Sequence, residues 1–195
     1  FNIPLYGTMA HSFVQAHADE TLAFEHFAHT QPDNVILLID TYDTEAAAEK
    51  VVSLASRLNA RGISIHGVRL DSGDLADHAR KVRHILDRGG LTATQILASG
   101  NLDEERIQTL VTGQAPIDSF AIGTAMTTSA DAPYLDCAYK LQESAGRPCR
   151  KRSEGKATWP GRKQVYRRIG TDGRLNGDII TVEGDCREGQ PLLGH

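Results

Sequence analysis

A histidine close to the N-terminus stands where the sequence predicts the start of a helix. His11 follows the small-residue segment 7–10, and a helix-like run, 13–28, comes directly after it. The first turn of a helix has unpaired backbone N–H groups and the positive end of the helix dipole, so this position suits a phosphate or another anion. An imidazole there can act as a nucleophile, as an acid or base, or as a ligand. The alternative is that Thr8 or Ser12 caps the helix and that His11 has no chemical role.

Four further groups of polar residues follow the later apolar runs of the chain. They are Asp40; Arg69 with Asp71, Ser72 and Asp74; Ser99 with Gly100 and Asn101; and Gly123 with Thr124. Glycines and hydroxyl groups at strand-to-helix turns cradle phosphate, paired carboxylates bind ribose hydroxyls or Mg²⁺, and arginine pairs with phosphate or carboxylate. Each group taken singly is also an ordinary cap or turn, so the prediction of a site depends on their meeting at one place.

An alternation of strands and helices would bring these groups together. The predicted strands are 3–5, 35–39, 62–68, 95–98 and 119–122, and the predicted helices are 13–28, 45–60, 75–88 and 103–112. Strand ends that recur every roughly 25–30 residues are typical of parallel strands with helices outside them. The carboxyl ends of parallel strands share one edge, where the active sites of such folds lie. The predicted fold class is therefore α/β, either part of a (β/α) barrel or a doubly wound sheet.

The end of the chain has a different pattern. Asp172-Gly173 lies between two strand-like runs, which is typical of a β-hairpin. We therefore expect residues 1–144 to form the barrel portion with the active site, and residues 145–195 to form a β-rich segment of a second, incomplete domain. Nine of the 21 Lys and Arg residues fall within 147–168, although the formal net charge is -4. Such a local patch favours binding of an anion at one place over a general nucleic-acid surface.

Several other classes of protein fit the sequence poorly. No apolar run approaches the roughly 18–20 residues of a membrane span, and no signal peptide precedes the first strand. The three cysteines, Cys137, Cys149 and Cys186, lack CxxC spacing, which argues against a zinc site and is typical of a reducing cytoplasm. The histidines at 17, 26 and 29 are interpreted as a solvated helix face, and no residue is assigned as a metal ligand.

Five segments of the sequence, taken together, strongly resemble nicotinate phosphoribosyltransferases. The segments are Gly7-Thr8-Met9-Ala10-His11-Ser12-Phe13, Arg69-Leu70-Asp71-Ser72-Gly73-Asp74, Ser99-Gly100-Asn101-Leu102-Asp103, Ile122-Gly123-Thr124, and Ser153-Glu154-Gly155-Lys156-Ala157-Thr158-Trp159-Pro160-Gly161. Each is weak alone, but five in family order are specific and span nearly the whole chain. The resemblance implies the irregular (β/α) barrel of type II phosphoribosyltransferases, followed by a β-rich segment.

The resemblance also implies a reaction and roles for residues. Family members make nicotinate mononucleotide from nicotinate and phosphoribosyl pyrophosphate in NAD salvage, with Mg²⁺, and couple this to ATP hydrolysis through a phosphorylated histidine. By resemblance, His11 is that histidine. We infer from its position after the preceding predicted strand that Asp40 is a partner that orients the imidazole. The expected substrate-binding residues are Thr8, Arg69, Asp71, Ser72, Asp74, Ser99, Gly100, Asn101, Gly123 and Thr124. The basic stretch with Arg152 and Lys156 is expected near ATP or the second domain.

The resemblance leaves alternatives open about what this chain does by itself. Family members have a long N-terminal portion before this point and form homodimers, so we expect a fragment or split subunit that needs the missing half or a second copy. One alternative is a non-catalytic phosphate-binding subunit with a companion chain, and another is nicotinamide phosphoribosyltransferase. A sugar-phosphate aldolase or isomerase barrel is disfavoured, because no Lys stands at a predicted strand end.

Overall fold

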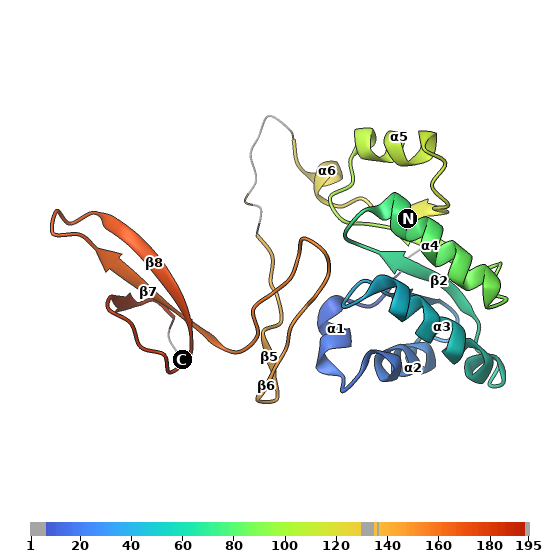
Figure 1. The fold of residues 1–195 in the computed structure, drawn as a ribbon, viewed down its shortest axis with the longest axis horizontal. Coiled ribbons are helices and arrows are strands. Elements are labelled where there is room, and N and C mark those ends of the chain that lie inside the picture. The colour runs from blue at the N-terminus through green and yellow to red at the C-terminus, as the bar shows by residue number, and fades with distance from the viewer. Residues whose placement is uncertain (1–6, 130–134, 136, 194–195) are drawn as a thin grey trace, which may run out of the picture. The chain divides into compact units, whose positions relative to one another are not determined.

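The computed structural model describes residues 7–129, 135 and 137–193 (Figure 1). The strand expected at 3–5 lies outside the described residues. Contacts between residues divide the chain into two compact units. The first runs to Tyr139 and also includes 151–157, and the second comprises 140–150 and the residues from Thr158 onward. The domain boundary expected at 145 stays a prediction, but the separation of 151–157 from its neighbours in sequence is a feature that the sequence did not reveal.

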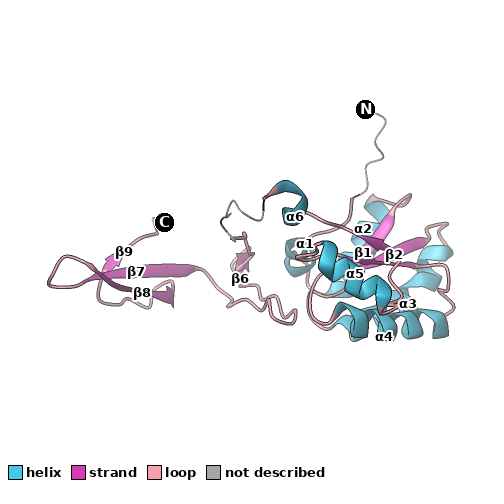
Figure 2. Cartoon of the chain, turned by 90° about the horizontal axis from the view of Figure 1, so that it is seen from above, coloured by secondary structure: helices cyan, strands magenta, loops and turns pink. Residues whose placement is uncertain are grey.

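A four-stranded parallel sheet forms the centre of the first unit. The strands β1 (Val35–Leu38), β2 (Ile65–Leu70), β3 (Gln95–Ala98) and β4 (Ser119–Phe120) lie side by side in chain order. All four residues of β1 are buried, as expected for a continuous apolar strand covered on both faces. The helices α3 (Thr44–Asn59) and α4 (Leu75–Arg88) pack on one another and along the sheet (Figure 2). The predicted α/β fold class with parallel strands is therefore confirmed.

An aspartate begins each of the three helices that follow β1, β2 and β3. Asp43 accepts a hydrogen bond from the backbone N–H of Ala46 and so caps α3. Asp74 does the same for α4, and Asp103 for α5 (Glu104–Thr112). A carboxylate at this position pairs N–H groups that the helix leaves unpaired. These caps turn the chain back immediately after each strand, so the residues between strand and cap stay at the carboxyl edge of the sheet.

The prediction of a single helix over 13–28 is wrong. The structure has two helices there, α1 (His11–Ala16) and α2 (Glu20–Thr30). The break arises because Asp19 adopts an extended conformation and accepts a hydrogen bond from Leu22 N, which starts a new helix. The apolar pattern continues through both helices, and Val14 and Phe24 are both buried in the core with β1. Because of the break, α1 is a separate short helix with His11 as its first residue.

The second unit consists of antiparallel strands. The long strands β7 (Lys163–Ile169) and β8 (Leu175–Val182) form the hairpin expected around Asp172-Gly173, and β9 (Gln190–Pro191) pairs with β7. Two short strands, β5 (Glu143–Ser144) and β6 (Arg147–Pro148), form a separate pair. Among the helices of the described residues, none combines the length and apolar character needed to cross a lipid bilayer.

Candidate active site at the carboxyl edge of the parallel sheet

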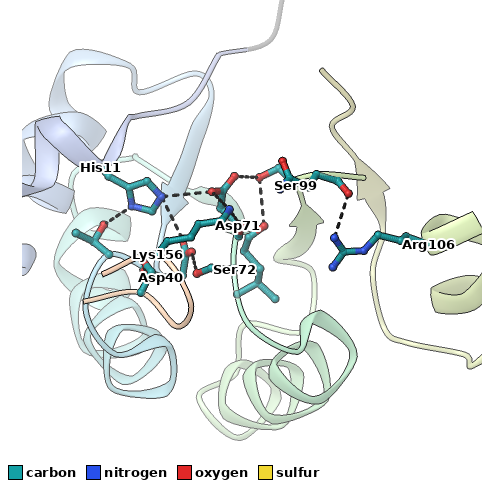
Figure 3. A network of polar contacts seen from close by, with 11 residues as sticks. His11, Asp40, Asp71, Ser72, Ser99, Arg106 and Lys156 are labelled. Atoms are coloured by element: carbon teal, nitrogen blue, oxygen red, sulfur yellow. Dashed lines mark hydrogen bonds and ion pairs between the residues drawn. The ribbon is translucent and has the colours of Figure 1, made fainter. Parts of the chain in front are cut away.

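His11 lies among polar groups that follow the ends of β1 and β2. Its Nδ1 is 3.0 Å from Thr41 Oγ1, and its Nε2 is 3.6 Å from Asp71 Oδ2 and 3.9 Å from Asp40 Oδ1 (Figure 3). Asp40 and Thr41 are the second and third residues after β1, and Asp71 comes directly after β2. Among the described residues, Nε2 is buried without a hydrogen-bond partner. The imidazole is thus held through one nitrogen, and the other faces two carboxylates.

Asp40 is a buried carboxylate fixed by hydroxyl groups. Its side chain is 1% exposed, and Ser72 Oγ donates a hydrogen bond to its Oδ2. Ser153 Oγ donates to the backbone carbonyl of the same residue. The remaining carboxylate oxygen, Oδ1, faces His11 and has no hydrogen-bond partner among the described residues. A buried carboxylate oxygen without a donor is costly, so this atom is a candidate ligand for a cation or a proton-bearing group.

Asp71 is the most heavily contacted carboxylate of the site. Ser99 Oγ donates to Oδ1 at 2.8 Å, and Lys156 Nζ donates to Oδ2 at 3.0 Å as well as to the Asp71 carbonyl. Burial disfavours the charged form, but the contacts with His11, Lys156 and Ser99 outweigh it and hold the pKa of Asp71 well below its ordinary value. Asp71 is therefore an anion at neutral pH, with an ammonium and an imidazole beside it.

The depressed pKa of Asp71 makes a testable contribution to stability. Because the folded pKa is lowered, ionised Asp71 stabilises the fold fully above its unfolded pKa of about 4, and this contribution is lost as the pH falls toward the folded pKa. We expect Asp71→Asn to lower the free energy of unfolding by roughly 1–3 kcal/mol at pH 7. The deficit should shrink as the pH falls from about 4 to about 2.5 in urea titrations of the full chain.

Asp33→Asn is the matched control, because Asp33 is an exposed turn residue. It should change the free energy of unfolding by less than about 0.5 kcal/mol at either pH. A deficit for Asp71→Asn that stays constant down to low pH would contradict the assignment of a depressed pKa.

Arg69 supplies a second cation close to the carboxylates. It is the fifth residue of β2, and burial lowers its pKa while Asp71 and Asp40 oppose that shift. Its Nε is buried without a hydrogen-bond partner among the described residues. Arginine keeps its charge in proteins, so this unused donor suits an anionic ligand.

A glycine turn after β3 approaches the Asp71 backbone closely. Gly100 has a φ of +90°, and a Cβ built there would lie 2.1 Å from the Asp71 carbonyl oxygen and 3.0 Å from Lys156 Nζ. Asn101, with a φ of 51°, continues the left-handed turn, and Arg106 donates a hydrogen bond to its carbonyl at 3.1 Å. Only a residue without Cβ fits this approach, so the turn brings backbone groups within reach of the site.

A pocket of about 1180 Å³ opens beside the same turn. Its lining includes Ser99, Gly100 and Asn101 from the turn after β3, and Gly123 and Thr124 at the start of α6 (Thr124–Thr127). Acidic side chains at the start of α5 line it as well. The two predicted phosphate-binding segments are thus brought to one pocket, although they are more than twenty residues apart in the sequence.

Thr8 and Asp74, which were expected to bind substrate, make hydrogen bonds to the backbone instead. Thr8 Oγ1 donates a hydrogen bond to the Ile36 carbonyl at 2.8 Å, and Asp74 caps α4. Conversely, the site includes Thr41 and Ser153, which sequence reasoning did not assign to it, and Lys156, which was expected near ATP or the second domain. The sequence pointed to Lys156 because this residue lies in a segment that resembles the family. Nothing in the sequence pointed to the contacts of Thr41 and Ser153 with the site, because their partners are distant in the sequence.

Comparisons with known proteins show which family the chain belongs to. Residues 1–147 match the model of the nicotinate phosphoribosyltransferase (NAPRTase) family. The chain is 46% identical, over 99% of its length, to nicotinate phosphoribosyltransferase pncB2 of Mycobacterium tuberculosis, and 40% identical, over 93%, to the Bacillus subtilis enzyme. It spans 41% and 38% of those two relatives. The crystal structure of nicotinate phosphoribosyltransferase from Vibrio cholerae shares the fold with a TM-score of 0.65 at 23% identity, covering 82% of this chain and 42% of its own. The chain therefore belongs to the nicotinate phosphoribosyltransferase family.

Proposed function

We propose that this chain is the central to C-terminal part of a nicotinate phosphoribosyltransferase. The reaction joins nicotinate to phosphoribosyl pyrophosphate, releases pyrophosphate and yields nicotinate mononucleotide for NAD salvage. The observation that carries the proposal is the meeting of His11, Asp40 and Asp71 at one edge of the sheet, beside two cations and a glycine turn. The names of the relatives support nicotinate as the substrate.

The glycosyl transfer requires positioning more than covalent chemistry from the protein. As the bond between ribose C1 and pyrophosphate breaks, C1 develops the character of an oxocarbenium ion, and the nicotinate nitrogen forms the new bond to C1. Ionised Asp71 is suited to accept hydrogen bonds from the ribose hydroxyls. Arg69 and Lys156 are suited to stabilise the negative charge that collects on the departing pyrophosphate. Held in place, these charges act without reorganisation during the reaction.

The pocket beside the glycine turn is suited to the 5′-phosphate of the ribose. Backbone N–H groups at Gly100 and Asn101, and at Gly123 and Thr124, belong to turns that precede α5 and α6. Such N–H groups bind phosphate, and Ser99 and Thr124 add hydroxyl groups. The acidic residues at the start of α5 would repel a phosphate, which favours the end of the pocket next to Gly100.

The two carboxylates fit the Mg²⁺ that the proposed reaction uses. Donor atoms of His11, Asp40 and Asp71 all lie within 4.8 Å of one another, and Asp40 Oδ1 has no hydrogen-bond partner among the described residues. Mg²⁺ prefers oxygen ligands, so Asp40 and Asp71 are the residues that would hold it. Bound there, it would neutralise charge on pyrophosphate or phosphoryl oxygens.

His11 is proposed as the phosphoryl acceptor that couples ATP hydrolysis to the reaction. If Nδ1–H donates to Thr41 Oγ1, the Nε2 lone pair is available as a nucleophile. Nε2 then forms a bond to the γ-phosphorus of ATP, and the bond to the bridging oxygen breaks so that ADP leaves with the electron pair. Water later attacks the phosphohistidine and releases phosphate. In this tautomer the hydrogen bond with Thr41 orients the imidazole, and Asp40, whose Oδ1 lies 3.9 Å from Nε2, would contribute by holding Mg²⁺.

The proposal is tested by measuring nicotinate mononucleotide formation from radiolabelled nicotinate. The chain is assayed alone and with a second chain that supplies the remainder of the Mycobacterium tuberculosis relative. We expect product in the combined sample, stimulation by ATP with Mg²⁺, and a preference for nicotinate over nicotinamide. A preference for nicotinamide would favour nicotinamide phosphoribosyltransferase, whereas phosphate binding without product in either sample would favour a non-catalytic subunit.

Gel filtration of the same two samples tests the proposed assembly. We propose that the active form is a cytoplasmic homodimer or a complex with the N-terminal half. The elution volume of the chain in gel filtration, with and without the second chain, distinguishes these two forms. Activity in fractions that contain the monomeric chain alone would contradict both.

A further inference from the structure

Loop 151–157 lies in the sequence between two segments of the second unit, but it belongs to the first unit and contacts the site at several points. Arg152 N donates to the Thr41 carbonyl at 2.9 Å, and Ser153 Oγ donates to the Asp40 carbonyl. Lys156 reaches Asp71 with its ammonium group. The loop therefore attaches to the residues that follow β1 and β2, and not merely to the surface of the unit.

The tip of this loop lies against α4. Glu154 Oε2 is 3.6 Å from His78 Nε2, and His78 Nδ1 is 2.8 Å from Glu45 Oε1 on α3. The His78 side chain is only 16% exposed. The imidazole is thus fixed between two helices, and its second nitrogen is presented to the loop.

Gly73, in the turn after β2, lies next to the contact between His78 and Glu154. Its φ is +74°, and a Cβ built there would come within 2.7 Å of His78 Nε2 and 2.8 Å of Glu154 Oε2. A side chain at this position would separate the two residues. The turn after β2 therefore leaves open the space through which the loop and α4 meet.

The ammonium of Lys156 has donor capacity that the protein does not use. An ammonium has three donors, and the two hydrogen bonds it makes with described residues both go to Asp71. It lies beside Gly100, where the phosphate pocket begins. A third donor at this point can meet an oxygen of a bound phosphate or pyrophosphate.

We propose that His78 and Glu154 are positioning residues that hold loop 151–157 so that Lys156 presents its ammonium to an anion at the Gly100 turn. The contacts of Glu154 and Ser153 support the positioning of the loop independently of any function. The identity of the anion as pyrophosphate rests on the proposed function. Breaking the contact between His78 and Glu154 leaves the Ser153 attachment in place but frees the tip of the loop. Lys156 then spends less time on Asp71.

The first test measures the position of Lys156 without using activity. The full chain is treated with an amine-acylating reagent in the absence of metal, and the rate of modification of Lys156 is measured by peptide mass spectrometry relative to Lys50. We expect Glu154→Gln and His78→Gln each to raise this rate roughly three- to fivefold, an effect of the size expected for a contact whose Glu154 side chain is 73% exposed. The double variant should show no further increase, because both changes break one contact.

Two controls make the result specific to the contact. His78→Lys, which places an ammonium donor between Glu45 and Glu154, should restore most of the protection of Lys156. Asp33→Asn, which removes an exposed carboxylate away from the loop, should leave the rate unchanged. Unchanged Lys156 reactivity in both Glu154→Gln and His78→Gln would overturn the positioning role, whatever the function of the protein.

The second test concerns the anion. Binding of pyrophosphate with Mg²⁺ to the full chain is measured by calorimetry for the wild type, Lys156→Met and Glu154→Gln. We expect Lys156→Met to weaken binding about tenfold and Glu154→Gln about threefold. Glu154→Gln and His78→Gln could alter the reactivity of Lys156 while Lys156→Met leaves the affinity for pyrophosphate unchanged. That result would overturn the anion-binding role of Lys156 alone. The proposed reaction would still be tested separately, by the assay of nicotinate mononucleotide formation.

Discussion

Replacing His11 with Ala is expected to abolish the stimulation of nicotinate mononucleotide formation by ATP. Nε2 of the imidazole lies 3.6 Å from Asp71 and 3.9 Å from Asp40, and it lacks a hydrogen-bond partner among the described residues. Removing it removes the proposed phosphoryl acceptor. The glycosyl transfer itself needs no protein nucleophile, so a basal rate without ATP should remain.

The experiment must distinguish the rate of product formation with ATP from the basal rate without ATP. Product formation is measured with and without ATP, for the chain combined with the remainder of its Mycobacterium tuberculosis relative. The wild type should be faster with ATP, whereas His11→Ala should give the same rate under both conditions. His84→Ala is the matched control, because His84 is an exposed residue of α4, and it should retain full stimulation. Retained stimulation in His11→Ala would remove the central role of this residue.

Gly100→Ala is expected to destabilise the fold and to weaken the binding of pyrophosphate. Two costs combine, because the left-handed conformation disfavours a side chain and the added Cβ would lie 2.1 Å from the Asp71 carbonyl oxygen. The strain of the conformation alone costs roughly 1 kcal/mol. Relief of the clash requires the turn to move away from Asp71, so we expect a total destabilisation of about 3 kcal/mol and at least about tenfold weaker pyrophosphate binding.

Gly90→Ala separates these two costs. Gly90 has a similar φ of +78°, but a Cβ built there meets nothing within 4 Å. It should therefore show only the strain of the conformation, about 1 kcal/mol in urea titrations, with unchanged pyrophosphate affinity. Equal destabilisation by the two substitutions would contradict the close approach of the turn to Asp71.

Local signals explain why much of the fold could be predicted from the sequence. The helix 75–88 was predicted with the bounds that the structure has, because Asp74 provides a cap and Gly89-Gly90 provides an end. The strand 95–98 was likewise predicted correctly, since an apolar run is flanked by turn residues. The break between α1 and α2 was missed because an aspartate inside an apolar period can either face solvent or start a new helix, and the sequence pattern does not distinguish these.

The candidate site was predictable only in part, for a related reason. Asp40, Asp71 and Ser99 meet because the carboxyl ends of parallel strands share an edge, which follows from the repeat of strands and helices. Loop 151–157 meets them through long-range contacts, such as that between Ser153 and Asp40, which are 113 residues apart. No local propensity encodes such a contact, and only the resemblance to a family drew attention to Lys156.

The most direct measurement of the central claim is the detection of phosphate on His11. The chain, alone and combined with the remainder of its Mycobacterium tuberculosis relative, is incubated with γ-labelled ATP and Mg²⁺, and the modified residue is identified under alkaline conditions that preserve phosphohistidine. We expect transfer of the γ-phosphoryl group to His11, seen as acid-labile, base-stable label on this residue in at least one of these samples and as its absence from His11→Ala. ATP-stimulated product formation with no label on His11, or with label on another residue, would contradict it.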